Sequence, residues 1–320
     1  MYKLNRKTLL IIILLITMGL SLSGCKKGEF TGKDGIIAKV NGDVITEKEF
    51  NGEFEMLKNM YKKQLGDDIL SQKTEEGKTY EDVLMDNLLE SMILEKLIGK
   101  EMEKLDIMVT DEEIEKVIKV RYIDGLGGEE KYKEFLGANN FTEDFLKSSL
   151  RKSMMDEKYR EDFFSKTEVP EDEIKEYYDS HKDSLVQVKA SLIQAETEED
   201  GTKIFERLEK GEDFHELATT ESIDPVTAAK GGDIGYFAKG TLKSFHELEE
   251  AAFSLGKGET SDLIESQSGY YIILVEDRKE EYEDLKENII PILKNEKYVN
   301  KLSELKAGAD VEIHTKKKDK

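Results

Sequence analysis

Few side chains in this 320-residue chain are of the kinds that usually carry covalent or metal chemistry. It has four histidines, scattered at positions 181, 215, 246 and 314, and a single cysteine at position 25. This set does not have the spacing of a zinc site, and the chain contains neither a phosphate-cradling glycine loop nor a nucleophile elbow. The sequence therefore predicts no metal and no cofactor, and it directs attention to carboxylates and hydroxyls in shaped loops.

One carboxylate, Asp224, stands in such a loop, the stretch from Ser222 to Phe237 with the sequence SIDPVTAAKGGDIGYF. Its glycines Gly231, Gly232 and Gly235 suit backbone angles that other residues resist, which predicts a shaped loop that enters a strand. An aspartate directly before a proline is also typical of a turn in which the carboxylate bonds to its own backbone. A local role and a role in a binding site both stay open for Asp224.

The segments around this loop follow a characteristic order. An alternating strand from Val186 to Ala195 and two short helices, around 204–208 and 214–218, come before the loop. The segments AAFSL, GETS and SGYYII follow it, starting at residues 251, 258 and 268. Over roughly Val186 to Glu276 this order resembles a parvulin-type peptidyl-prolyl isomerase domain. The resemblance implies a small antiparallel sheet with short helices, and rotation of prolyl peptide bonds as the activity.

Rotation of a prolyl bond does not require a nucleophile, a metal or a cofactor. The barrier of roughly 18–20 kcal/mol comes from amide resonance, and a protein lowers it by gripping the ring and stabilising a twisted amide. The resemblance implies apolar walls at Leu242, Leu248 and Phe253, with Phe245 as the alternative for the middle position. It also implies polar groups at Asp224, ahead of the double glycine, and at Ser268. Ordinary core or hairpin roles stay open for these residues.

The chain departs from the family at two positions. Parvulins usually carry a histidine in the first strand, in an ASHIL setting, and another in the last strand, in GYHII. This chain has ASLIQ and GYYII there, so that Leu192 and Tyr271 replace both histidines and are expected to line the pocket. The resemblance implies that the histidines belong to a hydrogen-bonding network that orients the site. Two hypotheses therefore compete, a prolyl isomerase and a holdase whose parvulin domain binds clients without turnover.

The remaining chain is mostly helical in pattern. A strand at 36–40, the turn signal Asn41-Gly42 and a capping box formed by Thr46 and Glu49 resemble the start of the chaperone region in exported foldases of the PrsA and SurA kind. Amphipathic helices fill 79–166, with starts at Thr110 and Thr142, and a further helix and a short strand follow at 282–305 and 309–313. The resemblance implies one chaperone domain made from both ends of the chain, which places the strands near Val40 and Val311 side by side.

Methionines are frequent in the helical part, which suggests two interpretations. Adaptable thioethers can line a groove for unfolded clients, or they can fill an ordinary helical core. The residues concerned are Met56, Met60, Met85, Met92, Met102, Met154 and Met155.

The N-terminus has the pattern of an export signal. Lys3, Arg6 and Lys7 precede an apolar run that is too short for a membrane span and ends in LSGC, which resembles a bacterial lipobox. Cys25 is then the lipidated first residue of the mature protein. We therefore expect it to be held by acyl chains on the extracytoplasmic face of a bacterial cell membrane.

Charge and element order narrow the range of partners. A formal charge of −22, without a basic groove, argues against nucleic acid. A solute-binding lipoprotein would need two lobes of alternating strands and helices, and the helical stretch 79–166 argues against it. The expected partners are unfolded or partly folded exported proteins, and the sequence leaves open whether two copies form a homodimer.

These expectations amount to an α+β chain, in which a mostly helical chaperone domain receives an inserted parvulin-like domain. The expected segments are a signal peptide at 1–24, a tether at 25–34, the chaperone domain at 35–182 and 280–314, the parvulin-like domain at 183–279 and a basic tail at 315–320.

Overall fold

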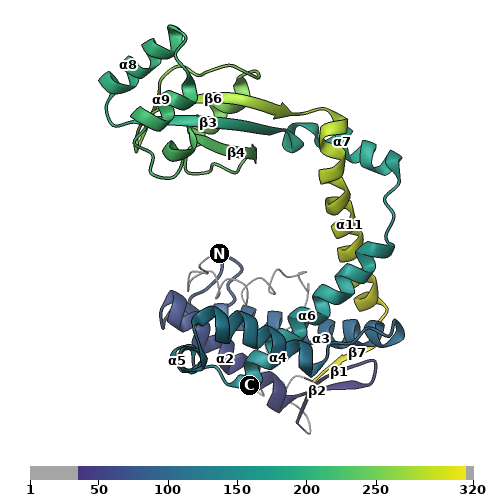
Figure 1. Cartoon of the computed structure of the whole chain (residues 1–320). Coiled ribbons are helices and arrows are strands. Elements are labelled where there is room, and N and C mark those ends of the chain that lie inside the picture. The colour runs from purple at the N-terminus through teal and green to yellow at the C-terminus, as the bar shows by residue number, and fades with distance from the viewer. Residues whose placement is uncertain (1–34, 315–320) are drawn as a thin grey trace. The chain divides into compact units, whose positions relative to one another are not determined.

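The computed structural model describes residues 35–314, which form two compact units (Figure 1). Unit 1 combines the described residues up to Thr167 with those from Lys297 onward, and unit 2 is Glu168–Glu296. The lipobox cysteine Cys25 and the basic tail lie outside the described residues. Across residues 35–314, no helix is both long and apolar enough to span a membrane.

The sheet of unit 1 joins the two ends of the described chain. It has the order β2-β1-β7 and is antiparallel, with β1 at Ile36–Val40, β2 at Asp43–Thr46 and β7 at Val311–Ile313. Asn41 and Gly42 make the β1–β2 turn with φ of 49° and 89°. Val40 is the direct partner of Val311, so the expected proximity of these strands is confirmed.

Three helices of unit 1 begin at the threonine caps that the sequence predicted. Capping boxes at Thr46 and Thr110 start α2 (Glu47–Leu65) and α4 (Asp111–Val117), and Thr142 caps α6 (Glu143–Lys166). The other elements are α3 (Tyr80–Lys104), α5 (Glu129–Asn139), the short 3-10 helix η2 (Ile69–Ser71), the π-helix η3 (Ile118–Asp124) and the second part of α11 (Tyr282–Ala307). Both ends of the chain therefore build one mostly helical unit.

The methionines favour one of the two interpretations. Met60, Met92 and Met102 are buried, and the other four that the groove hypothesis would need are half-buried. Met85, Met154 and Met155 pack against three different apolar clusters. Packing against separate clusters favours the ordinary helical core over one shared groove.

Unit 2 is built around an antiparallel sheet of order β4-β3-β6-β5. The strands are β3 (Gln187–Ala195), β4 (Asp233–Ala238), β5 (Ile264–Ser266) and β6 (Gly269–Lys279). Helices α8 (Glu198–Glu209) and α9 (Phe214–Glu221) pack on the face with Ile193 and Ile272. Helix α10 (His246–Ser254) packs on the face with Ala190 and Ile273. This is the predicted small sheet with short helices.

A helix pair completes unit 2. Helix α7 (Glu171–Leu185) packs on the first part of α11 through a core that includes Ile174, Leu285 and Ile289. This pair belongs to the same compact unit as the sheet. The expected domain limits at 182/183 and 279/280 follow the family pattern and stay a prediction.

Candidate functional site

The glycine-rich loop has the backbone that the sequence predicted. Gly231, Gly232 and Gly235 have φ of 67°, 85° and 74°, a region that favours glycine. The turn also presses against β3. Leu192 N donates to Gly232 O at 2.9 Å, and a Cβ at Gly232 would stand 2.3 Å from Leu192 O. Glycine is therefore required at position 232 by both conformation and space.

Asp224 is half-buried in the segment before this turn, between α9 and the 3-10 helix η4 (Ala228–Lys230). Its Oδ2 accepts hydrogen bonds from Thr227 N at 2.8 Å and from Thr227 Oγ1 at 2.5 Å. The carboxylate thus holds its own turn, as the local interpretation predicted. A role beside a rotating prolyl bond stays a prediction.

The Asp224 segment is attached to the end of β3. Ile223 N donates to Gln194 O at 2.9 Å, and Gln194 N donates to Ser222 Oγ at 3.0 Å. Gln194 is in turn the direct cross-strand partner of Tyr271. Asp224 is therefore tied to the end of the sheet that carries Tyr271.

Tyr271 and Ser268 form a hydrogen-bonded pair at this end. The two hydroxyl oxygens are 2.6 Å apart, with Tyr271 only 4% exposed and Ser268 on the surface. Leu192 is opposite Ile273, two residues along from Tyr271, so alternation places Leu192 and Tyr271 on the same face of the sheet as α10. A tyrosine hydroxyl thus stands where the family usually has a histidine.

The predicted apolar walls fall into two groups on this face. Leu242 and Phe253 pack on one core with Phe237, whose ring meets that of Phe253 edge-on at 5.7 Å. Leu248 is buried, with 1% of its surface exposed, whereas Phe245 is 36% exposed and its ring lies 6.0 Å from that of Tyr271. Phe245, the alternative for the middle wall, is thus better placed to meet a ligand than Leu248.

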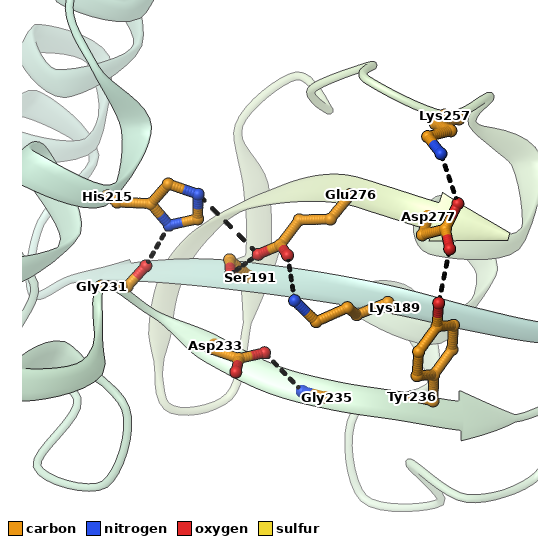
Figure 2. Close-up of polar contacts among 10 residues, drawn as sticks. All are labelled: Lys189, Ser191, His215, Gly231, Asp233, Gly235, Tyr236, Lys257, Glu276 and Asp277. Carbon is orange, nitrogen blue, oxygen red and sulfur yellow. Dashed lines mark hydrogen bonds and ion pairs between the residues drawn. The ribbon is translucent and has the colours of Figure 1, made fainter.

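A second polar group, on the other face of the sheet, was not anticipated (Figure 2). Opposite Lys189 and Ala190, β6 contains one extra residue, Glu276, which forms a bulge. Glu276 accepts hydrogen bonds from Lys189 Nζ at 2.5 Å and from Ser191 Oγ, and its Oε1 lies 3.9 Å from His215 Nε2. A bulge leaves no periodic pattern in the sequence, so nothing in the sequence indicated that Glu276 and its partners would lie together.

The Glu276 cluster reaches the glycine turn. His215, on α9, hydrogen-bonds through Nδ1 with Gly231 O at 2.9 Å. Burial alone would raise the pKa of Glu276, but the hydrogen bonds from Lys189 and Ser191 outweigh burial and lower the pKa overall. An ionised carboxylate therefore links β3, β6, α9 and the turn.

The next residue, Asp277, connects β6 to the edge strand β4 through a hydrogen bond. Asp277 accepts hydrogen bonds from the Tyr236 hydroxyl at 2.5 Å and from Lys257 Nζ at 2.6 Å (Figure 2), and these bonds lower its pKa to about 2. Asp233, within the glycine-rich loop, accepts from Gly235 N at 2.9 Å and so fixes the loop. Among residues 35–314, no three His, Cys, Asp or Glu side chains are grouped as metal ligands.

Two family models match the chain. The model described as SurA-like N-terminal domain matches residues 2–160, and the model described as PPIC-type PPIASE domain matches residues 181–277.

Relatives align over nearly the whole length. Foldase protein PrsA of Caldanaerobacter subterraneus subsp. tengcongensis is 34% identical over 270 residues, which are 84% of this chain and 82% of the relative. Foldase protein PrsA of Clostridium botulinum is 28% identical over 333 residues, covering 98% of both chains. The crystal structure of PrsA from Bacillus subtilis is 27% identical, with 89% of this chain and 95% of that chain covered and a TM-score of 0.33.

Proposed function

The chain belongs to the PrsA foldase family, with a SurA-like N-terminal region and a PPIC-type parvulin domain, and from this premise we propose that it assists the folding of exported proteins at the outer face of a bacterial membrane. Unit 1 holds unfolded clients, and the parvulin domain accelerates the isomerisation of their prolyl bonds. Uncatalysed isomerisation takes tens to hundreds of seconds and is slow enough to limit folding.

One observation carries the catalytic part of the proposal. The face of the sheet that holds Leu192 and Tyr271 also holds an apolar group with Leu242 and Phe253, and the Asp224 segment joins the same end of that sheet. A ring-binding wall beside a few polar groups is what catalysis of amide rotation needs. The Tyr271–Ser268 pair keeps a hydrogen-bonding group where the family usually has a histidine.

A second candidate function is a holdase without turnover. It is favoured by the engagement of the Asp224 carboxylate with Thr227, and by the loss of both family histidines to Leu192 and Tyr271. In that case the parvulin domain presents a binding surface, and protection of clients is the whole activity.

A peptide isomerisation assay on the mature full-length chain separates the two functions. We expect a rate of cis–trans exchange above background, and we expect Asp224→Ala to lower kcat/KM at least about tenfold, which corresponds to about 1.4 kcal/mol of transition-state stabilisation. The control is Thr227→Val, which removes the hydroxyl bonded to Asp224 and leaves the carboxylate in place.

Each result decides between the hypotheses. Equal losses in Asp224→Ala and Thr227→Val would assign Asp224 to the turn alone. Suppression of client aggregation by a chain that gives no rate above background would establish the holdase and reject the isomerase.

The proposed membrane attachment is supported by the signal-like N-terminus and by the single cysteine, Cys25. We expect Cys25→Ala to leave the precursor uncut or to release the protein from membranes, because no acyl chain can then be attached. Fractionation of cells that express either form, followed by immunoblotting, measures this. A processed Cys25→Ala protein that stays with the membrane would contradict the proposal.

A further inference from the structure

A buried carboxylate on α10 connects that helix to the loop that contains Leu242. Glu249 is only 6% exposed. Its Oε1 accepts a hydrogen bond from Gly240 N at 2.7 Å, and its Oε2 accepts one from Leu242 N at 2.8 Å. Both donors belong to the loop that follows β4, so one side chain of α10 holds this loop at two successive points.

Glu249 is held in its ionised form, which strengthens its hydrogen bonds to the loop. Burial alone would raise its pKa, but the hydrogen bonds from Gly240 and Leu242, together with the nearby charges of His246 and Lys239, lower the pKa overall. The group is therefore ionised at neutral pH, and both hydrogen bonds are charge-assisted, which makes them stronger than bonds between neutral groups.

The two hydrogen bonds to Glu249, which together form a clamp between the loop and α10, affect the position of apolar side chains in the proposed site. Leu242 contributes to the wall through a backbone that Glu249 holds, while Phe253 stands on the same helix as Glu249. Beyond Leu242 the chain reaches Phe245, the N-cap residue of α10, whose N–H donates to Leu242 O at 2.8 Å and whose ring meets that of Tyr271 edge-on. Movement of the Gly240–Leu242 segment would therefore shift Leu242 relative to α10, to Phe253 and to the Phe245 ring at the start of that helix.

We propose that Glu249 is a positioning residue, whose carboxylate sets the separation between the Gly240–Leu242 segment and α10 and so determines how tightly the site grips a proline ring. This inference rests on the proposed function of the parvulin domain. Helix α10 itself does not depend on the clamp, because Leu248 and Ala252 are 1% and 0% exposed and anchor it in the core.

The test replaces Glu249 by glutamine in the mature full-length chain. The amide is isosteric, but its NH2 group would face a backbone N–H, so at least one of the two hydrogen bonds is lost. We expect KM for a short peptide with an Ala-Pro bond to rise about tenfold while kcat changes less, because an apolar wall contacts the ring in the ground state and the transition state alike. Glu247→Gln, an exposed position on the same helix, makes the same charge change and should leave both constants unchanged.

Amide NMR signals give a readout that is independent of turnover. In the wild type, the Gly240 and Leu242 amide shifts should follow a common titration at a pH below 4.5, because the pKa of Glu249 is lowered. This titration should be absent in Glu249→Gln and intact in Glu247→Gln. If the wild type has no turnover, the proposed isomerase fails, and the Kd of the same peptide, measured by NMR titration, takes the place of KM. Two outcomes would overturn the inference. In the first, the Gly240 and Leu242 amide signals shift in Glu249→Gln while KM and Kd stay within about twofold of wild type. In the second, these two amide signals do not shift in Glu249→Gln at all.

Discussion

Gly232→Ala is expected to destabilise unit 2 and to abolish whatever activity the parvulin domain has. The new Cβ would stand 2.3 Å from Leu192 O and 3.1 Å from Leu192 N, and both of these are backbone atoms of the central strand β3. The residue would also keep a φ of 85°. Left-handed strain costs roughly 1–2 kcal/mol and overpacking typically adds 1–3 kcal/mol. The sum is a large part of the 5–15 kcal/mol that stabilises an ordinary domain.

Thermal unfolding together with the peptide isomerisation assay measures the effect of Gly232→Ala. The matched control is Gly235→Ala, three residues further along the chain in β4, where φ is 74° but no neighbouring atom lies within 4 Å of the added Cβ. The control should show only the cost of strain, so the difference between the two variants isolates the contact with β3. Equal losses of stability would mean that the turn does not press against Leu192.

Lys152→Ala is expected to cause the largest loss of stability in unit 1. Lys152, on α6, lies 2.6 Å from Glu53 of α2 and 3.0 Å from Glu95 of α3, and the three side chains are 15%, 21% and 26% exposed. Burial lowers the pKa of Lys152, but Glu95 and Glu53 outweigh burial and raise it overall. Removal of the cation leaves two poorly solvated carboxylates facing each other, which should cost about 2–4 kcal/mol.

The measurement is chemical unfolding of the mature chain, with hydrogen exchange of α2, α3 and α6 to assign the change to unit 1. Lys147→Ala is the control, because Lys147 lies on the same helix but pairs with the exposed Glu115 and Glu143, and such pairs contribute little. The triple variant Lys152→Met, Glu53→Gln, Glu95→Gln should recover most of the stability, since no charge is then left without a partner. If Lys152→Ala unfolds like Lys147→Ala, the triad does not hold the helices.

The stability that Lys152 contributes depends on pH, because it requires the ionised form of the side chain. A lysine whose pKa is raised by folding contributes stability that is fully present below its unfolded value of 10.5 and is lost as the pH rises through the folded value. The contribution of Lys152 is therefore fully present at neutral pH and is lost only as the pH rises above 10.5.

Local chemistry explains why much of the fold could be predicted. A threonine followed three residues later by a glutamate starts α2 and α4 because both cap bonds lie within four residues. Gly231, Gly232 and Gly235 have positive φ because only glycine adopts that region without strain. The order of segments from Val186 to Glu276 supported a family resemblance, and that resemblance implied both the small sheet and the proximity of the strands near Val40 and Val311.

The amino-acid sequence by itself thus determined the helix starts, the shaped glycine turn and the membership of a family, all of which depend on neighbouring residues or on their linear order. Only the tertiary structure decided which distant partners two carboxylates have: the Gly240–Leu242 loop for Glu249, and Lys189, Ser191 and His215 for Glu276. It also decided that Leu248 is buried while Phe245 is exposed beside Tyr271. The reason is that a hydrogen bond between distant segments depends on bulges, strand register and helix packing, which arise from the sum of many contacts and leave no periodic signal in the chain.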